Sequence, residues 1–183
     1  MIMNDHKTEN VVGALALTLS DILLEASQSE APDNVTAAGL TLVGHVPGLS
    51  IHELSHGLSL SHPGTVRLVD RMVAENLMER RPSKEDGRAV ALFLTPKGKR
   101  RERKILLSRR DALGNVLSLL SRDERQRLAQ ISEKIIATIL KGEEHALRIC
   151  RLCDEGACVD CPVDAELERK SQAENRLELS QHE

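Results

Sequence analysis

Residues 61–72 read SHPGTVRLVDRM, a pattern that predicts a helix with one buried face and one polar face. Ser61 suits the N-cap position, and Pro63 fits the first turn, where the missing amide proton costs no hydrogen bond. Asn76 stands where a left-handed residue would end the helix. The apolar residues recur at helical spacing as a single stripe: Val66, Val69, Met72 and Val73.

The flanking segments predict a helix pair that is followed by a hairpin and further helices. Ser50 and Glu53 form an S-x-x-E capping box, which starts a short helix shortly before residue 61, and Ser121 and Glu124 form a second one, which starts a later helix. Asp86-Gly87 between two short strand-like runs is a hairpin signal. The expected helices are 11–29, 35–45, 50–58, 61–75, 95–120 and 121–147, and the expected strands are 77–81 and 88–94. This order predicts a mainly α fold with a small β-hairpin wing, a winged helix-turn-helix with a helical dimerisation region.

The composition agrees with a helical fold whose core is aliphatic. The 183 residues are 40% hydrophobic, yet they include a single Phe, Phe93, and no Trp or Tyr. A platform that stacks single-stranded nucleic acid depends on aromatic residues, so the composition disfavours that class. No stretch approaches the ~20 apolar residues of a membrane span, and residues 1–10 lack the basic-then-apolar pattern of a signal peptide. We therefore expect a cytoplasmic protein with no membrane association.

The charge is unevenly distributed along the chain. The net charge is −3, but residues 61–110 hold 14 Lys and Arg against 6 Asp and Glu. Residues 141–183 hold 6 Lys and Arg against 11 Asp and Glu. A basic middle in a mildly acidic chain is typical of a local phosphate-binding surface, although a solvated charged helix gives the same pattern.

Four short motifs, in this order, resemble the MarR family of transcriptional regulators. SHPGTVRLVDRM at 61–72 resembles the recognition helix, and NLMER at 76–80 resembles the helix end and the first wing strand. DGR at 86–88 matches the D-x-R signature of the wing, and LTPKG at 94–98 matches the strand-to-helix junction. The chain departs from the family at Asn76, where Gly is usual. The resemblance covers about residues 11–147, with the DNA-binding core at about 35–94.

The resemblance implies a homodimer, joined by the first helix and the last two, that binds a pseudo-palindromic operator in double-stranded DNA. By position, Arg88 would enter the minor groove, Asp86 would hold it, and Arg80 and Arg81 would approach phosphates. Arg67 would contact a guanine edge or a phosphate. A small-molecule effector is a further partner that the family implies, although this chain has few aromatic residues to line a pocket. The expected DNA-contacting residues are Ser61, His62, Gly64, Thr65, Arg67, Arg71, Arg80, Arg81, Lys84, Asp86 and Arg88.

Residues 52–56, HELSH, match the H-E-x-x-H motif of zinc metalloproteases, in which two histidines bind zinc and the glutamate acts as a base. The helix is short, Gly57 follows at once, and Glu53 already has a capping role, so the context disfavours a protease. We favour two histidines, His52 and His56, on an exposed helix face near DNA phosphates.

All four cysteines lie in one window with the spacing Cys150-x2-Cys153-x4-Cys158-x2-Cys161. Two C-x-x-C pairs can supply four thiolates to a tetrahedral ion, and zinc favours such sites. The last three cysteines also have the spacing of plant-type two-iron, two-sulfur sites, and a metal-free thiol switch is a third hypothesis. The charged neighbours of the cysteines disfavour plain burial in an apolar site. Residues 148–163 thus form a four-cysteine motif, which precedes a charged tail at 164–183.

These observations predict a repressor-type DNA-binding regulator without enzymatic activity. Its four-cysteine site, with zinc expected first, either senses a signal or only stabilises the C-terminal segment, because the cysteines are not a general feature of the MarR family. Two other functional classes stay open: a zinc-dependent hydrolase that uses the HELSH string, and a winged-helix module for protein contacts. Binding to duplex DNA that weakens steeply with salt would separate the regulator from the protein-contact module.

Overall fold

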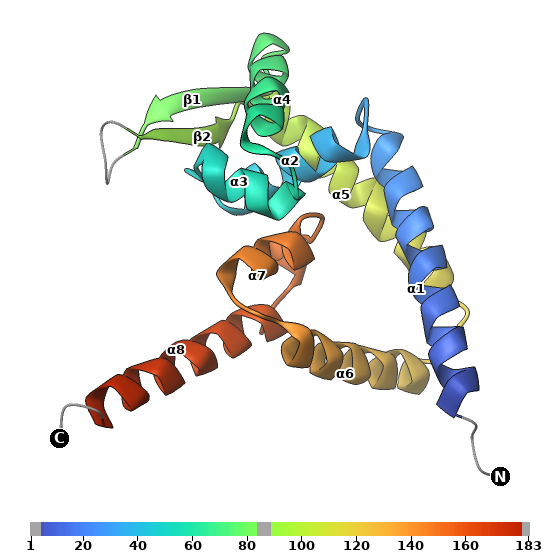
Figure 1. The fold of residues 1–183 in the computed structure, drawn as a ribbon. Coiled ribbons are helices and arrows are strands. Elements are labelled where there is room, and N and C mark those ends of the chain that lie inside the picture. The colour runs from blue at the N-terminus through green and yellow to red at the C-terminus, as the bar shows by residue number, and fades with distance from the viewer. Residues whose placement is uncertain (1–4, 84–88, 181–183) are drawn as a thin grey trace.

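The structure is a computed structural model that describes residues 5–83 and 89–180. Within these residues the chain forms a mainly helical fold with a single antiparallel hairpin, as the sequence predicts (Figure 1). The elements in chain order are α1 (Asp5–Gln28), α2 (Asn34–His45), α3 (Ile51–Leu58), α4 (His62–Ala74), β1 (Met78–Pro82), β2 (Val90–Leu94), α5 (Pro96–Leu117), α6 (Arg122–Ile139), α7 (Glu143–Cys150), the short 3-10 helix η1 (Glu155–Ala157) and α8 (Pro162–Ser180).

The winged helix-turn-helix occupies one end of the molecule, where α2, α3 and α4 meet the hairpin (Figure 1). The two strands are antiparallel, with Met78 opposite Leu94 and Pro82 opposite Val90. Ser50 forms a bridge to Ala91, so the chain that leads into α3 extends the small sheet. The core beneath is aliphatic, as the composition predicts, and its fully buried side chains include Leu40, Leu42, Leu54, Val69, Met72, Met78, Leu92 and Ile105.

The helix caps that the sequence predicts are present. Ser50 and Glu53 form a complete capping box at the start of α3, and Ser121 and Glu124 form a second one at the start of α6. These side chains satisfy backbone amides that have no partner inside the helix, which fixes where each helix begins. Asn76 has a φ of 55°, which confirms the left-handed residue expected after α4.

The long helices α1 and α5 lie side by side and extend away from the winged helix (Figure 1). Much of α1 is exposed, including the apolar residues Val11, Val12, Leu15 and Leu17. Of the described helices, His6–Gln28 alone is long and apolar enough to cross a membrane, with a mean hydropathy of 1.3 and 6% of that window buried. This finding corrects the expectation that no stretch approaches the length and hydrophobicity of a membrane-spanning helix. It is weak evidence for a membrane helix, because length and composition are its entire basis.

The expected helix at 121–147 is wrong, since the structure divides it into α6 and α7. Leu140 leaves the helical conformation with a ψ of 127°, and Gly142 has a φ of 153°. A residue with a side chain rarely adopts that φ, so glycine makes the break possible. The periodic pattern of apolar residues continues through the break, and for this reason the sequence indicated one helix.

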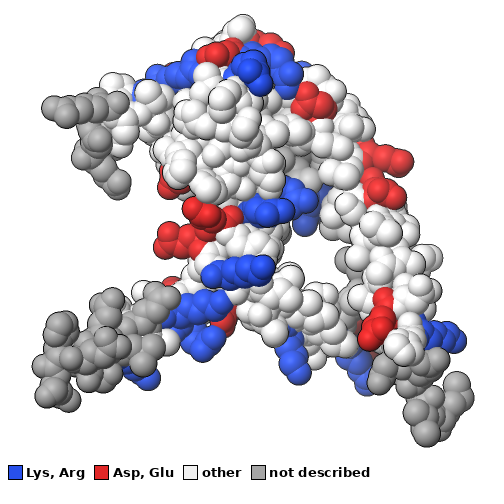
Figure 2. Space-filling view, in the orientation of Figure 1, with Lys and Arg blue, Asp and Glu red and all other residues white. Residues whose placement is uncertain are grey.

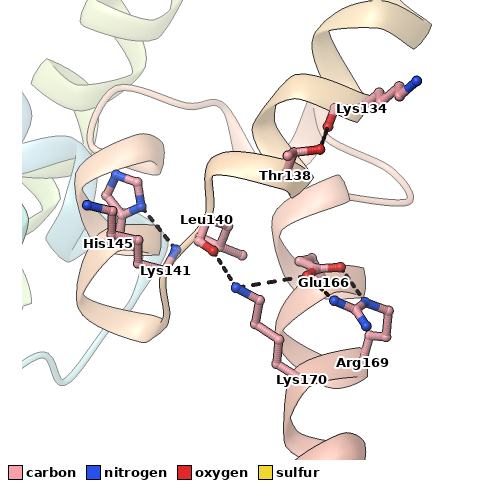
Figure 3. Close-up of polar contacts among 8 residues, drawn as sticks. All are labelled: Lys134, Thr138, Leu140, Lys141, His145, Glu166, Arg169 and Lys170. Atoms are coloured by element: carbon pink, nitrogen blue, oxygen red, sulfur yellow. Dashed lines mark hydrogen bonds and ion pairs between the residues drawn. The ribbon is translucent and has the colours of Figure 1, made fainter.

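A second, smaller core holds α6, α7 and α8 together. Leu140, Ala146 and Val163 are buried in it, and Cys150 and Cys161 pack against them. Figure 3 shows the polar contacts beside it: the Lys170 ammonium donates to the carbonyl of Leu140, and the Arg169 guanidinium pairs with Glu166 at 2.6 Å. The charged tail is helical as far as Ser180, the end of α8.

The C-terminal elements also contact the winged helix directly. Helix α7 lies under α3 (Figure 1), and Leu147 packs against the main core. Leu152, between two of the cysteines, is buried in that same core. His45 at the end of α2 lies 3.9 Å from the carboxylate of Glu155 in η1. The cysteine segment is thus attached to the helices that carry the candidate DNA-binding surface.

Candidate nucleic-acid interface and cysteine site

The N-terminal part of α4 presents a polar surface. The Ser61 hydroxyl accepts a hydrogen bond from the Gly64 amide at 3.3 Å, which caps the helix. Ser61, His62 and Arg67 are exposed, and among the described residues Arg67 has no ion-pair partner. Figure 2 shows basic side chains, with some acidic ones among them, over α4 and the base of the hairpin. A basic surface at a helix N-terminus suits DNA phosphates.

Thr65 is not part of that surface, which corrects the sequence-based assignment. Its side chain is fully buried, and its hydroxyl donates to the Ser61 carbonyl at 3.2 Å. The buried stripe of α4 is shifted by one position relative to the prediction, with Val66 and Val73 only partly buried. It consists of Thr65, Leu68, Val69 and Met72.

Arg71 has a structural role that the sequence did not indicate. Its guanidinium pairs with Asp33 at 2.8 Å and donates to the Thr36 hydroxyl at 2.8 Å. Asp33 is the N-cap of α2, so these contacts tie α4 to the start of α2. A DNA contact by Arg71 would compete with this network. Among the exposed arginines, Arg71 is therefore the least suited to the predicted contact with DNA.

Arg80 and Arg81 lie on β1, beside α4. Arg80 pairs with Asp70 of α4 at 2.7 Å, which links the helix to the wing. Arg81 pairs with Glu79 and lies 4.6 Å above the ring of Phe93. Their predicted role at phosphates stays a prediction. Three further candidates lie outside the described residues: Lys84, Asp86 and Arg88.

The two histidines of the HELSH string face each other on α3. The Nε2 atoms of His52 and His56 are 3.3 Å apart; His52 is exposed, as predicted, whereas His56 is only partly exposed. Glu53 is held in the capping box, where its carboxylate accepts the Ser50 amide at 2.8 Å. Glu144 of α7 lies 3.2 Å from Nδ1 of His56. The sequence missed Glu144 because it is far from the string and only the fold brings it close.

The four cysteines form two thiol pairs, Cys150 with Cys153 and Cys158 with Cys161. Cys158 is exposed and the other three are partly buried. The sequence suggested a more polar setting than the structure provides, since Cys150 and Cys161 border the second core. Among the described residues, three ligand atoms within 4.8 Å of one another occur at the histidine pair and Glu144, not at the thiols.

The thiols differ strongly in acidity. A hydrogen bond from Cys150 lowers the pKa of Cys153 to about 6, and the charges of Arg109 and Arg151 act in the same direction. The same hydrogen bond, together with burial, raises the pKa of Cys150. Burial and Cys161 raise the pKa of Cys158 to about 11. A thiolate at Cys153 near neutral pH is the form that binds metals and reacts with oxidants.

Comparison with known proteins gives matches of sequence and of fold. Residues 39–89 match the family model described as "MarR family". The chain is 33% identical over 92 residues to the transcriptional repressor MprA of Escherichia coli K12, over 50% of this chain and 52% of MprA. It is 23% identical over 147 residues to the HTH-type transcriptional repressor MdtR of Bacillus subtilis, over 79% of this chain and 95% of MdtR. The match to MprA thus spans about half the length of that protein.

The fold is shared with solved structures of MarR-family proteins. A MarR family protein from Bacillus stearothermophilus has a TM-score of 0.67 at 24% identity, over 76% of this chain and 99% of that one. Wild-type MarR from Escherichia coli in its apo form has a TM-score of 0.59 at 20% identity, over 70% of this chain and 96% of that one. Residues 39–89 thus match the MarR family, and the chain shares the winged helix-turn-helix fold of the MarR-family structures.

Proposed function

We propose that the chain is a transcriptional repressor that binds a pseudo-palindromic operator as a homodimer. The observation that carries this proposal is the exposed N-terminal face of α4, with Ser61, His62 and Arg67 beside two arginines of β1. A helix of this kind reads base edges in the major groove while basic neighbours contact phosphates. MprA and MdtR, which the chain resembles, are both named repressors. A cytoplasmic location accompanies this function.

Exposed apolar residues on two helices support the dimer. In α6, no side chain is fully buried, and Ile131, Ile135 and Ile139 are each at least half exposed. In α1, Val11, Val12, Leu15 and Leu17 are also exposed, each by at least 44%. Isolated apolar residues are common on surfaces, but sets of this size on two helices indicate a partner surface. A symmetric partner would also place two copies of α4 on successive half-sites.

We further propose that Cys150, Cys153, Cys158 and Cys161 form a zinc site, with an iron–sulfur cluster and a metal-free thiol switch as the alternatives. The thiolate character of Cys153 and the two C-x-x-C pairs support a metal site. The attachment of Leu152 to the winged-helix core gives this site a physical route to α2 and α3. Metal loss or thiol oxidation would then alter the position of the DNA-binding helices.

DNA binding is tested by fluorescence anisotropy with duplexes enriched from a random pool, at several salt concentrations. We expect Arg67→Ala to weaken binding by about 1–3 kcal/mol if Arg67 contacts a base edge, or to lower the salt slope by about 1 if it contacts a phosphate. Arg169→Ala removes the same charge from α8, at the far end of the chain, and should leave binding unchanged. Absence of salt-dependent binding by the unmodified chain would instead favour the protein-contact module.

The cysteine site is tested by metal analysis and an absorption spectrum of protein purified without oxygen. Stoichiometric zinc without visible absorption supports the zinc site, and iron with sulfide and charge-transfer bands supports the cluster. If neither zinc nor iron is found, the thiol switch remains as the hypothesis, and it predicts that oxidation changes DNA affinity. If replacing all four cysteines by serine leaves folding, DNA affinity and the response to metal or oxidant unchanged, the cysteines have no sensing role. A signal would then have to act through a small-molecule effector pocket.

A further inference from the structure

Two imidazoles on α3 are arranged as a pair of metal ligands. His52 and His56 are one turn apart, which places both side chains on the same face of the helix. Their rings lie 4.5 Å apart at an interplanar angle of 82°, with the Nε2 atoms 3.3 Å from each other. A tetrahedral ion with zinc–nitrogen distances of about 2.0–2.1 Å separates two ligand nitrogens by about 3.3 Å. The observed spacing of the two nitrogens is therefore that of two ligands of one ion.

A carboxylate from another helix completes the group. Glu144 in the first turn of α7 places Oε2 3.2 Å from Nδ1 of His56. Ligand atoms of His52, His56 and Glu144 all lie within 4.8 Å of one another. Glu144 can bind an ion directly or orient His56 through Nδ1, as outer carboxylates do at many metal-bound histidines. Either arrangement makes α7 part of the site.

We propose that His52, His56 and Glu144 bind a divalent transition-metal ion of the zinc class, separate from the cysteine motif, and that the ion clips α3 to α7. Two imidazoles and one carboxylate suit zinc and its neighbours, whereas magnesium and calcium prefer oxygen ligands alone. The ligands are reachable from solvent, since His52 is exposed and the side chain of Glu144 is 70% exposed. An adjoining cavity of about 850 Å³, lined in part by His56 and Glu144, leaves room for water ligands.

The proposed role of the ion is structural, because the glutamate that would serve a hydrolase as its base is engaged in the helix cap. In an H-E-x-x-H enzyme the glutamate between the histidines acts as the base. Here Glu53 accepts the backbone amide of Ser50 and belongs to the helix cap. The third ligand, Glu144, belongs to α7, the helix that ends at Cys150. The ion would therefore join the first helix of the helix-turn-helix to the segment that leads into the cysteines.

An ion bound between α3 and α7 would restrict the motion of these helices. Helices α3 and α7 already touch closely, because Gly57 faces Leu147 without a side chain between them. An ion bound by both helices would fix α7 at a second point and restrict its rotation against α3. Because a short connection joins α3 to α4, the restriction would extend to α4, the candidate DNA-binding helix. The binding of the ion itself does not depend on the proposed repressor function.

The test is zinc binding by the full chain in reducing buffer, measured by competition with a chromophoric chelator. We expect His52→Ala and His56→Ala each to bind one equivalent of zinc less than the unmodified chain. This difference does not depend on whether the cysteines also bind zinc. We expect Glu144→Gln to lower the zinc affinity of this site by about 10–100-fold. His6→Ala and Glu143→Gln are the matched controls, an exposed histidine of α1 and the acid next to Glu144, and both variants should bind zinc as the unmodified chain does. His52 is exposed, so His52→Ala tests the site without a loss of packing.

Hydrogen exchange supplies an independent readout. Zinc should slow amide exchange in α3 and α7 of the unmodified chain, and it should not do so in His52→Ala. Magnesium should leave exchange unchanged in both proteins. The proposal is overturned if the zinc stoichiometry is the same with and without the two histidines. It is equally overturned if the histidine-dependent zinc has no effect on exchange in α7, or if magnesium binds equally well.

Discussion

The guanidinium of Arg71 on α4 lies 2.8 Å from the carboxylate of Asp33, the residue that caps α2. Asp33 also accepts the Thr36 amide at 2.6 Å. Asp33→Ala removes the cap and the ion pair together, and we expect it to lower the free energy of unfolding by about 0.5–2 kcal/mol in urea denaturation. Asp33→Asn keeps a capping oxygen and should lose less. An Asn variant as unstable as the Ala variant would show that the cap itself contributes nothing.

The same carboxylate predicts a pH dependence. Partial burial of Asp33 opposes ionisation, but hydrogen bonds from Thr36 and the charge of Arg71 outweigh it, so the pKa lies below its ordinary value of 3.8. A carboxyl with a lowered pKa binds fewer protons when folded than when unfolded. Its contribution to stability is therefore present above pH 3.8 and is lost as the pH falls through the pKa in the folded state. The difference in stability between the unmodified chain and Asp33→Asn should shrink over this range. A constant difference would contradict the assignment.

The features that the sequence predicted are those with a local cause. A cap needs a serine and an amide three residues later, so Ser50 and Ser121 mark helix starts without any knowledge of the fold. Asn76 ends α4 through its own backbone preference. The order of elements, and with it the family resemblance, follows from such local signals. The break that the sequence missed, at Gly142, is a place where the apolar period continues although the backbone turns.

The features that the sequence could not predict join distant parts of the chain. Glu144 reaches His56, and Asp33 reaches Arg71, only because whole helices pack in a particular arrangement. The burial of Thr65 reflects a rotation of α4 by one position about its axis, which the apolar pattern does not fix. Polar residues on the expected DNA face were therefore identified as a group, while their individual roles depended on tertiary contacts.

The ion pair between Asp70 and Arg80 offers a way to raise DNA affinity. Asp70 places a negative charge on α4 and holds the Arg80 guanidinium at 2.7 Å. Asp70→Asn removes this charge and frees Arg80, so we expect several-fold tighter binding and a salt dependence that is steeper by up to about 1 in slope. The double change Asp70→Asn with Arg80→Ala should lose the gain.

The matched control for this prediction is Asp111→Asn, which removes an exposed acid from α5 that lies 3.4 Å from Arg110. It changes the net charge by the same amount and should leave DNA affinity nearly unchanged. Equal gains from Asp70→Asn and Asp111→Asn would mean that overall charge, and not the local release of Arg80, governs binding. Anisotropy titrations at two salt concentrations are sufficient to separate these outcomes.

The contact between α3 and α7 depends on the missing side chain of Gly57. A Cβ there would lie 2.7 Å from Cδ1 of Leu42 and 3.2 Å from Cβ of Leu147. Leu42 is fully buried and cannot move aside freely. We expect Gly57→Ala to cost about 1–3 kcal/mol in stability and to speed amide exchange in α7. Gly114→Ala in α5, where a Cβ meets nothing within 4 Å, should instead be neutral or stabilising. Similar effects at both glycines would argue against a tight approach of the two helices.

Leu152 is the link between the cysteine segment and the winged helix. It lies between Cys150 and Cys153, and its side chain is only 9% exposed within the main core. We expect Leu152→Ala to lower the free energy of unfolding by about 2–5 kcal/mol, since it removes a buried side chain. Val159→Ala, in the same segment but 80% exposed, should have almost no effect. Urea denaturation measures both. If the two variants behave alike, the cysteine segment is not anchored in the core, and a signal at the thiols would have no physical route to α4.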